Sequence, residues 1–340
     1  MSILTKSLGL AILAGAIAAP TVDAQESRVD KNLPNYRPVE GVSGSIKSVG
    51  SDTMNNLMAL WAGGFNTHYP SVQVEIEGKG SGTAPPALTE GTSNFGPMSR
   101  AMKDAEMDEF EKKYGYKATA LATSIDMLAV YVHKDNPISG LTLAQVDAIF
   151  SKNRDGGYSE DVTTWGQLGL TGEWANKRIE LYGRNSASGT YGFFKKNALF
   201  KGDFKDSVKE QPGSSSVVSA VAGDPYAIGY SGIGYKTADV RAVPIARNSG
   251  SEFVEATPEN TDGYPLARFL WTYVNYEPGT QLDPLRREFA KFIFSRQGQE
   301  IVLKDGYLPI SAPIARRELA KVNVELPPVT ETLTEASAPR

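Results

Sequence analysis

The segment IELYGRNSASGTYGFFKKNAL, residues 179–199, shows most clearly how this chain is organised. Its apolar start predicts a short strand over Ile179–Tyr182, and its end predicts a helix over Tyr191–Leu199. Between them lies a turn of glycine and small hydroxyl residues, 183–190. A strand that runs through such a turn into a helix is the repeating unit of α/β proteins.

The same order occurs twice in the first hundred residues. A predicted strand at 46–49 ends at Gly50, and Ser51-Asp52-Thr53 follows where the next helix begins. A second strand, 72–76, runs into Gly80-Ser81-Gly82-Thr83, with two prolines at the following helix start. The alternation continues along the chain. We therefore predict an α/β fold in which helices flank a mainly parallel sheet.

Further elements are expected from the same hydrophobic patterns. The predicted helices cover 103–114, 142–150, a segment that begins at Ser214, 285–294 and 297–303. The predicted strands cover 118–123, 127–133, 227–230, 241–245 and 269–274.

The length of the chain and one break in the pattern predict two lobes. A single core stops growing at about 250–300 residues, and this chain has 340. Asp135-Asn136-Pro137 interrupts the alternation and marks a predicted first crossing. We assign 44–134 and 262–324 to lobe one and 135–261 to lobe two, so that two crossings form a hinge.

Both ends are predicted to lie outside the fold. Residues 1–24 contain Lys6, an apolar run over 8–19 and small residues before Ala24, which is the pattern of a cleaved export signal. The run is shorter than the roughly 20 residues that span a bilayer, although an uncleaved anchor is an alternative. We expect a periplasmic protein with a flexible leader, 25–43, and a flexible tail, 325–340.

The composition excludes several classes of function. The net charge of −4 argues against a nucleic-acid partner, which a basic domain or stripe would indicate. The chain has no cysteine and two histidines, His68 and His133, that are not at ligand spacing. We therefore expect no zinc or thiolate metal site, no cysteine nucleophile and no histidine-based catalysis.

The three strand ends share a chemistry suited to anions. Glycine allows close approach to backbone N–H groups, the helix dipole adds partial positive charge, and hydroxyls donate further hydrogen bonds. Strand ends of an open α/β sheet also lie where ligands bind. For each loop, ordinary helix capping is the structural alternative. The candidate residues in these loops are Ser51, Thr53, Ser81, Gly82, Ser186, Ser188, Gly189 and Thr190.

Two arginines strengthen the prediction of an anion site. Arg184 follows a predicted buried strand and precedes a helix, where its guanidinium can bind an oxyanion through two hydrogen bonds. Arg100 follows Ser99 after another short apolar segment. A solvated surface position is the alternative for either arginine.

Four passages resemble the phosphate-binding proteins of ABC-type phosphate importers, which have the type II periplasmic-binding-protein fold. They are VGSDTMNNLMALWAGGF (49–65), GKGSGTAPPALTEGTSNFGPMSR (78–100), YGRNSASGTYGFF (182–194) and SSSVVSAVAGDPYAIGYSGIGY (214–235). The segments LAQVDAIFS and YPLARFLWTYVN, in the expected order, support the resemblance. It extends from about Gly44 to Pro313.

The resemblance implies two α/β lobes that close over one inorganic phosphate, which a membrane permease then receives. We expect a monomer that holds no metal or cofactor and has no enzymatic activity. Carried over to this sequence, the expected phosphate ligands are Ser51, Thr53, Ser81, Gly82, Ser99, Arg100, Arg184, Ser186, Ser188, Gly189 and Thr190.

Two departures from the family pattern leave the choice of anion open. Many members carry an aspartate two residues after the arginine that matches Arg184, where this chain has Ser186. Many also carry an aspartate in the segment matching 97–101, which accepts the proton of hydrogen phosphate. Sulfate or molybdate binding is therefore one alternative, and a phosphatase with a loop serine as nucleophile is another.

Overall fold

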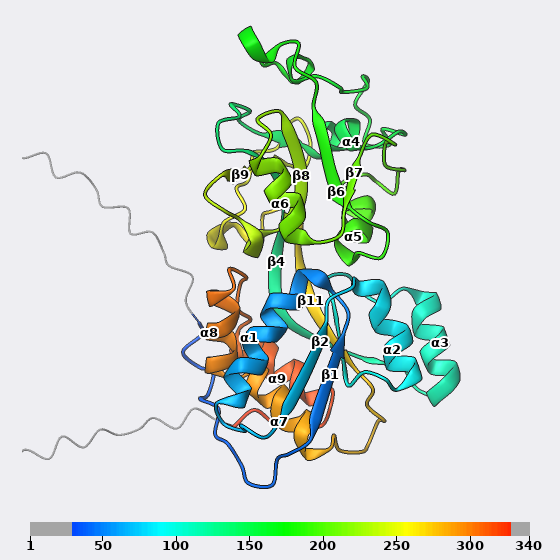
Figure 1. Cartoon of the computed structure of the whole chain (residues 1–340), viewed down its shortest axis with the longest axis vertical. Coiled ribbons are helices and arrows are strands. Elements are labelled where there is room, and N and C mark those ends of the chain that lie inside the picture. The colour runs from blue at the N-terminus through cyan, green and yellow to red at the C-terminus, as the bar shows by residue number, and fades with distance from the viewer. Residues whose placement is uncertain (1–28, 328–340) are drawn as a thin grey trace, which may run out of the picture.

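Two lobes joined by two long strands make up the computed structural model, which describes residues 29–327 (Figure 1). The predicted export signal, 1–24, and residues 328–340 of the predicted tail lie outside the described residues. From residue 29 to residue 327, no helix combines the length and apolar character needed to cross a membrane.

A nine-stranded sheet runs through both lobes in the order β2-β1-β3-β11-β4-β8-β6-β7, and β9 pairs with β4. Within lobe one β1 pairs in parallel with β2 and β3, and within lobe two β6 pairs in parallel with β7 and β8. The connecting strands β4 and β11 are antiparallel to their neighbours. The strands are β1 (Ser45–Val49), β2 (Gln73–Glu77), β3 (Phe95–Met98), β4 (Thr119–His133), β6 (Glu180–Arg184), β7 (Lys209–Gln211), β8 (Ala227–Gly232), β9 (Val240–Ala242) and β11 (Ala267–Val274).

Strand β4 differs from the prediction of two separate strands. It continues through Ser124 and Asp126, whose polar side chains are fully buried within the sheet. These residues pair with β11, whereas Leu128–Val132 pairs with β8 in lobe two. The strand therefore enters lobe two ahead of Asp135-Asn136-Pro137, where the sequence suggested the crossing. The sequence predicted a break at the polar residues Ser124 and Asp126, because it does not reveal that they are buried between two neighbouring strands.

Helices cover both faces of the sheet in lobe one. The first core cluster lies under α1, α7, α8 and α9, and a second cluster lies under α2 and α3 on the other face. The helices are α1 (Asn55–Asn66), α2 (Ala84–Glu90), α3 (Asp104–Tyr114), α4 (Leu143–Phe150), α5 (Gly189–Asn197), α6 (Ser214–Ala222), α7 (Pro284–Ile293), α8 (Arg296–Lys304) and α9 (Ala312–Ala320). Helix α9, which begins with a proline in its first turn, was not predicted.

Lobe two has its own core, in which aromatic rings hold α4 and α5 against the sheet. Phe194 of α5 stacks on Tyr230 of β8, with ring centroids 3.9 Å apart, and Phe150 of α4 meets both rings edge-on. Two short strands, β5 (Leu141–Thr142) and β10 (Ile245–Ala246), pair separately from the main sheet. The predicted strand 241–245 is thus divided between β9 and β10. This packing fixes the N-terminus of α5 at the end of β6.

The described part of the predicted flexible leader packs on lobe one. Leu33, Tyr36 and Val42 are buried in the first core cluster. The Tyr36 amide donates to Gln297 Oε1 over 2.8 Å, and Arg296 donates to the Lys31 carbonyl. The prediction was therefore wrong for this part, because a polar average composition concealed three apolar residues that reach the core.

Candidate anion-binding site between the lobes

Hydroxyl groups from both lobes meet in one buried cluster. The Oγ1 atoms of Thr53 and Thr190 lie 2.9 Å apart, and Thr53 Oγ1 lies 3.5 Å from Ser214 Oγ. Ser99 Oγ lies 3.4 Å from Thr190 Oγ1 and 3.2 Å from Ser81 Oγ. All five side chains are buried. We refer to these residues as the hydroxyl cluster.

Each lobe supplies its part of the cluster from strand-to-helix junctions. In lobe one, Thr53 lies in η1 (Asp52–Met54) after β1, and Ser81 begins η2 (Ser81–Thr83) after β2. In lobe two, Thr190 lies in the first turn of α5 and Ser214 begins α6. The chain leaves the sheet through a helical turn in both lobes, so positive helix ends lie at the cluster. Amides at these turns are already bonded, Thr190 N–H to Ser188 Oγ and Ser214 N–H to Asp52 Oδ2.

Gly189 lies at a close contact between the lobes. A Cβ atom built at Gly189 would lie 2.2 Å from Ser81 Oγ and 2.6 Å from Ser99 Oγ. No side chain fits there without displacing one of these hydroxyls. Nearby, the Gly82 amide donates to the Ala187 carbonyl over 3.0 Å. Gly189, the second glycine of the segment 183–190, is therefore required by this contact.

Arg184 enters the cluster from the end of β6. Its Nη1 donates to Ser214 Oγ over 2.6 Å, and Nη2 lies 3.2 Å from Asp52 Oδ2. Burial lowers the pKa of Arg184, and the neighbouring Asp52 carboxylate opposes that shift. Among residues 29–327, the buried Nε of Arg184 has no hydrogen-bond partner. This N–H group remains available to an anion.

A second buried guanidinium, that of Arg268 at the start of β11, reaches the same cluster. Its Nη2 donates to Thr190 Oγ1 over 2.9 Å, and its Nη1 donates to the Ser99 carbonyl over 2.8 Å. Two further bonds, of 3.0 and 2.8 Å, fix it on the fully buried carboxylate of Asp126. Arg268, Asp126 and Ser214 were not among the predicted site residues. An arginine between apolar strand residues was the signal that could have identified Arg268.

The hydroxyl cluster provides hydrogen-bond donors for an anion. The two closest carboxylates, Asp52 and Asp126, are each held by an arginine. Within the part of the chain that the structure describes, no group of three or more histidines, cysteines and carboxylates could hold a metal ion. Hydroxyls, a free guanidinium N–H and helix N-termini together suit a compact anion.

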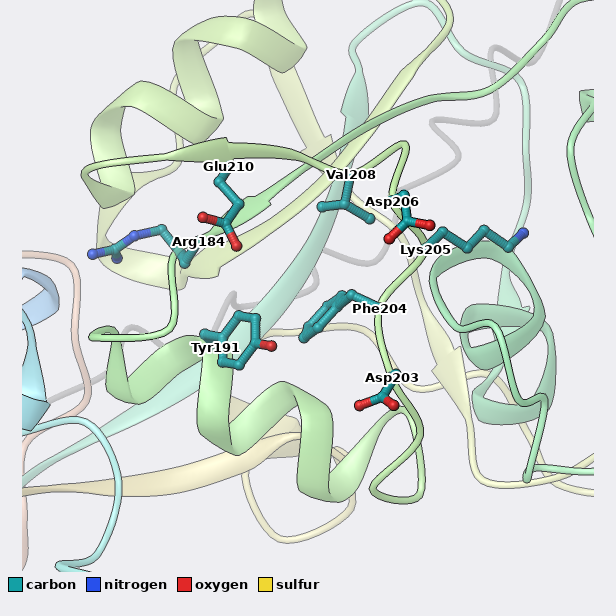
Figure 2. Close-up of a pocket in the computed structure, with 8 residues that line it drawn as sticks. All are labelled: Arg184, Tyr191, Asp203, Phe204, Lys205, Asp206, Val208 and Glu210. Atoms are coloured by element: carbon teal, nitrogen blue, oxygen red, sulfur yellow. The ribbon is translucent and has the colours of Figure 1, made fainter.

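Two hollows lie next to these arginines. A cavity of about 360 Å³ in lobe two is lined by Arg184, Tyr191, Phe204, Val208 and Glu210, among others. Figure 2 shows the Arg184 guanidinium directed away from the acidic and aromatic side chains of this cavity. A larger groove of about 570 Å³ is lined by residues 100–104, by residues from α5, and by Arg268. Arg268 therefore connects a groove between the lobes with the hydroxyl cluster.

Comparisons with known proteins identify the family of this chain. A family model described as a PBP superfamily domain matches residues 35–297. The phosphate-binding protein PstS of Pseudomonas aeruginosa is 54% identical over 315 residues, which is 92% of this chain and 96% of that protein. This chain belongs to the PstS phosphate-binding protein family. As a PstS family member it is a binding protein and not an enzyme.

More distant relatives give the same result. PstS of Bacillus subtilis is 28% identical over 301 residues, covering 87% of this chain and 90% of that protein. Among solved structures, a putative phosphate ABC transporter substrate-binding protein of Clostridium perfringens with bound phosphate is 29% identical. It matches with a TM-score of 0.67, over 79% of this chain and all of that one. The PstS fold predicted from the sequence is thus confirmed.

Six predicted site residues of this PstS family member lie in or at the hydroxyl cluster. Thr53, Ser81, Ser99 and Thr190 supply hydroxyls, Arg184 supplies a guanidinium and Gly189 closes the gap between the lobes. Ser51 is buried beside them, and its amide donates to the Pro97 carbonyl over 2.7 Å. Gly82 is at the interlobe contact described above.

Three predicted residues contribute no side chain to the hydroxyl cluster in this structure. Arg100 donates two hydrogen bonds, of 2.7 and 2.6 Å, to Glu106, so its charge is neutralised within lobe one. Ser186 is exposed. Ser188 caps α5, where its Oγ accepts hydrogen bonds from the Thr190 and Tyr191 amides. Capping, the structural alternative named for these loops, therefore accounts for Ser188.

Proposed function

We propose that this protein captures inorganic phosphate between its lobes and delivers it to an ABC importer. The observation that carries the proposal is the hydroxyl cluster with the guanidiniums of Arg184 and Arg268. These groups come from both lobes and are buried together. The names of the PstS relatives and the bound phosphate of the Clostridium perfringens structure agree with this function.

The proposed ligand shell combines predicted and newly found residues. It consists of Thr53, Ser81, Ser99, Arg184, Gly189, Thr190, Ser214 and Arg268. Serine and threonine hydroxyls can rotate from one another toward an anion, so the contacts within the hydroxyl cluster are replaced rather than lost. Charge-assisted hydrogen bonds from two guanidiniums add strength in a site that excludes water.

Closure of the lobes would complete this shell. Thr53, Ser81 and Ser99 belong to lobe one, whereas Arg184, Thr190 and Ser214 belong to lobe two. The strands β4 and β11 connect the lobes beside Arg268, and a few residues at such a connection absorb a hinge motion. An open form would expose the two half-sites, and the bound anion would bring them together.

The route of delivery follows from the same proposal. We expect the predicted signal, residues 1–24, to be cleaved on export. The monomeric protein would then meet a permease of the cytoplasmic membrane. Both are extensions of the periplasmic binding function that characterises this family.

One observation favours a second anion class. Among the described residues, both carboxylates at the cluster are already engaged, Asp52 by Arg184 and Asp126 by Arg268. A free carboxylate would favour hydrogen phosphate over sulfate, because hydrogen phosphate can donate a proton to it. Sulfate or molybdate is therefore the alternative ligand.

Isothermal titration of the purified protein with phosphate, sulfate and molybdate tests the proposal. We expect phosphate binding that excess sulfate does not prevent. The Arg184→Ala variant should lose tight binding while remaining folded, and Arg178→Ala, which removes an exposed arginine of the same lobe, should bind normally. Tighter binding of sulfate or molybdate than of phosphate would replace the proposed ligand, and no anion binding at all would refute the proposal.

A further inference from the structure

Asp52 connects the two lobes at the anion site. Its carboxylate comes from lobe one, at the end of β1, and reaches two groups of lobe two. Asp52 Oδ2 lies 3.2 Å from Arg184 Nη2 and accepts a 2.7 Å hydrogen bond from the Ser214 amide. One oxygen thus neutralises the buried arginine and caps the N-terminus of α6.

Lobe two also holds the backbone at this position. The Tyr235 hydroxyl, in η5 (Ile233–Tyr235), donates to the Asp52 carbonyl over 3.0 Å and lies 3.3 Å from the Thr53 carbonyl. On the other side, Gly213 lies close to the carboxylate, since a Cβ there would be 3.2 Å from Asp52 Oδ1. The carboxylate therefore occupies a closely packed position between the lobes, with 23% of its side chain exposed.

In the described structure, Arg184 has no carboxylate partner within its own lobe. Its other hydrogen bonds go to the neutral Ser214 Oγ and to the Pro212 carbonyl. At position 186, two residues after the arginine, an exposed serine stands. Separation of the lobes would remove the carboxylate from both Arg184 and α6. In the open protein water would solvate the Arg184 guanidinium, and no carboxylate would fix its orientation.

We infer that Asp52 is a positioning residue that orients Arg184 across the cleft and ties formation of the anion site to closure of the lobes. The inference rests on the proposed function. Asp52 need not touch the anion, because it occupies Nη2 and leaves the buried Nε of Arg184 unpaired. The Arg184 guanidinium is held in position for the anion only when the lobes are closed. Anion binding and closure therefore favour each other.

The test compares phosphate titrations of four full-length proteins. They are the unsubstituted protein, Asp52→Asn, Asp52→Asn with Ser186→Asp, and Glu210→Gln as the matched control. Glu210 is an exposed carboxylate in the cavity beside Arg184, and Figure 2 shows the guanidinium directed away from it. Thermal unfolding without phosphate confirms that each variant is folded.

We expect Asp52→Asn to weaken phosphate binding about tenfold or more, mainly through faster dissociation. Small-angle scattering with saturating phosphate should also show a larger open fraction. The second variant should regain most of the affinity, because Ser186→Asp returns a carboxylate to the lobe that holds Arg184. Glu210→Gln should bind as the unsubstituted protein does.

Two results would overturn the inference. An unchanged affinity and dissociation rate in Asp52→Asn would show that the carboxylate does not position Arg184. Weaker binding by Asp52→Asn with no larger open fraction at saturating phosphate would show that Asp52 does not tie the site to closure of the lobes. If the unsubstituted protein itself failed to bind phosphate, the proposed function would fail instead, so the two failures can be told apart.

Discussion

The hydroxyl oxygens of Thr53 and Thr190 lie 2.9 Å apart, although 137 positions separate these residues in the chain. Each follows the end of a parallel strand, β1 in lobe one and β6 in lobe two. The contact exists because the carboxyl ends of strands in both lobes face one cleft. Most of the following predictions test the side-chain contacts in that cleft.

Substitution of Arg268 should affect stability and anion binding together. Arg268→Gln removes the counter-charge of the fully buried Asp126, so the free energy of unfolding should fall by about 3 kcal/mol. The hydrogen bond to Thr190 Oγ1 is also lost, which should weaken phosphate binding. Urea unfolding and titration calorimetry measure the two effects.

The double variant Arg268→Gln with Asp126→Asn is the control for this experiment. It leaves no buried carboxylate unpaired, so it should recover stability without recovering the affinity. Equal stability of the single variant and the unsubstituted protein would contradict the role assigned to this ion pair.

Substitution of Gly189 should hold the lobes apart. A Cβ in Gly189→Ala would meet Ser81 Oγ at 2.2 Å and Ser99 Oγ at 2.6 Å in the closed protein. Overpacking of this kind costs about 1–3 kcal/mol, so phosphate affinity should drop roughly tenfold or more. Calorimetry provides the measurement.

Gly192→Ala, one turn further along α5, is the matched control for that substitution. Its Cβ would have Arg100 Cδ at 3.4 Å as its nearest neighbour. Alanine is a better helix former than glycine, so the Gly192→Ala variant should be at least as stable as the unsubstituted protein. It should bind phosphate with normal affinity. Similar affinity losses in both glycine variants would argue against a specific contact at Gly189.

Replacement of Ser188 separates its capping role from a catalytic one. Ser188→Ala removes the hydrogen bonds to the Thr190 and Tyr191 amides, which should lower the free energy of unfolding by about 1 kcal/mol. Neither the unsubstituted protein nor the variant should hydrolyse an aryl phosphate. Ser186→Ala, at an exposed position, should leave stability unchanged. Turnover that disappears in Ser188→Ala would point back to a serine nucleophile.

Asp305 should make stability depend on pH in the acidic range. Burial raises its pKa to about 6 from the ordinary value of 3.8, although Asn56 donates to it. The folded protein therefore binds a proton more tightly than the unfolded chain. Its contribution to stability is present at low pH and is lost as the pH rises from about 4 to about 6, a difference of about 3 kcal/mol.

Asp305→Asn should remove this part of the pH dependence. An uncharged side chain at the same place cannot titrate, so the variant should be more stable than the unsubstituted protein at pH 7. Thermal unfolding between pH 4 and pH 7 measures the difference. Parallel stability curves for the two proteins over that range would show that Asp305 does not titrate as described.

The local parts of the site could be predicted from the sequence. A strand followed by glycine, small hydroxyls and a helix identified Thr53, Ser81, Gly189 and Thr190, because such a turn is specified by residues adjacent in the chain. Arg184 was found for the same reason, since it stands directly at a strand end. Contacts between side chains could not be predicted in this way. Arg100 occupies a similar place, but the side chain of Glu106 takes its charge, and spacing alone did not reveal that pairing.

By itself, the sequence determined the α/β class, the strand-to-helix turns and the family, because local patterns carry these features. Only the tertiary structure decided which side chains share the cleft. The pairing of β11 with β4 places Arg268 on Asp126, and the approach of the lobes brings Asp52 to Arg184. The physical reason is that burial and opposite charge act between residues far apart in the chain. The partners of a buried charge are therefore set by the packing of whole elements.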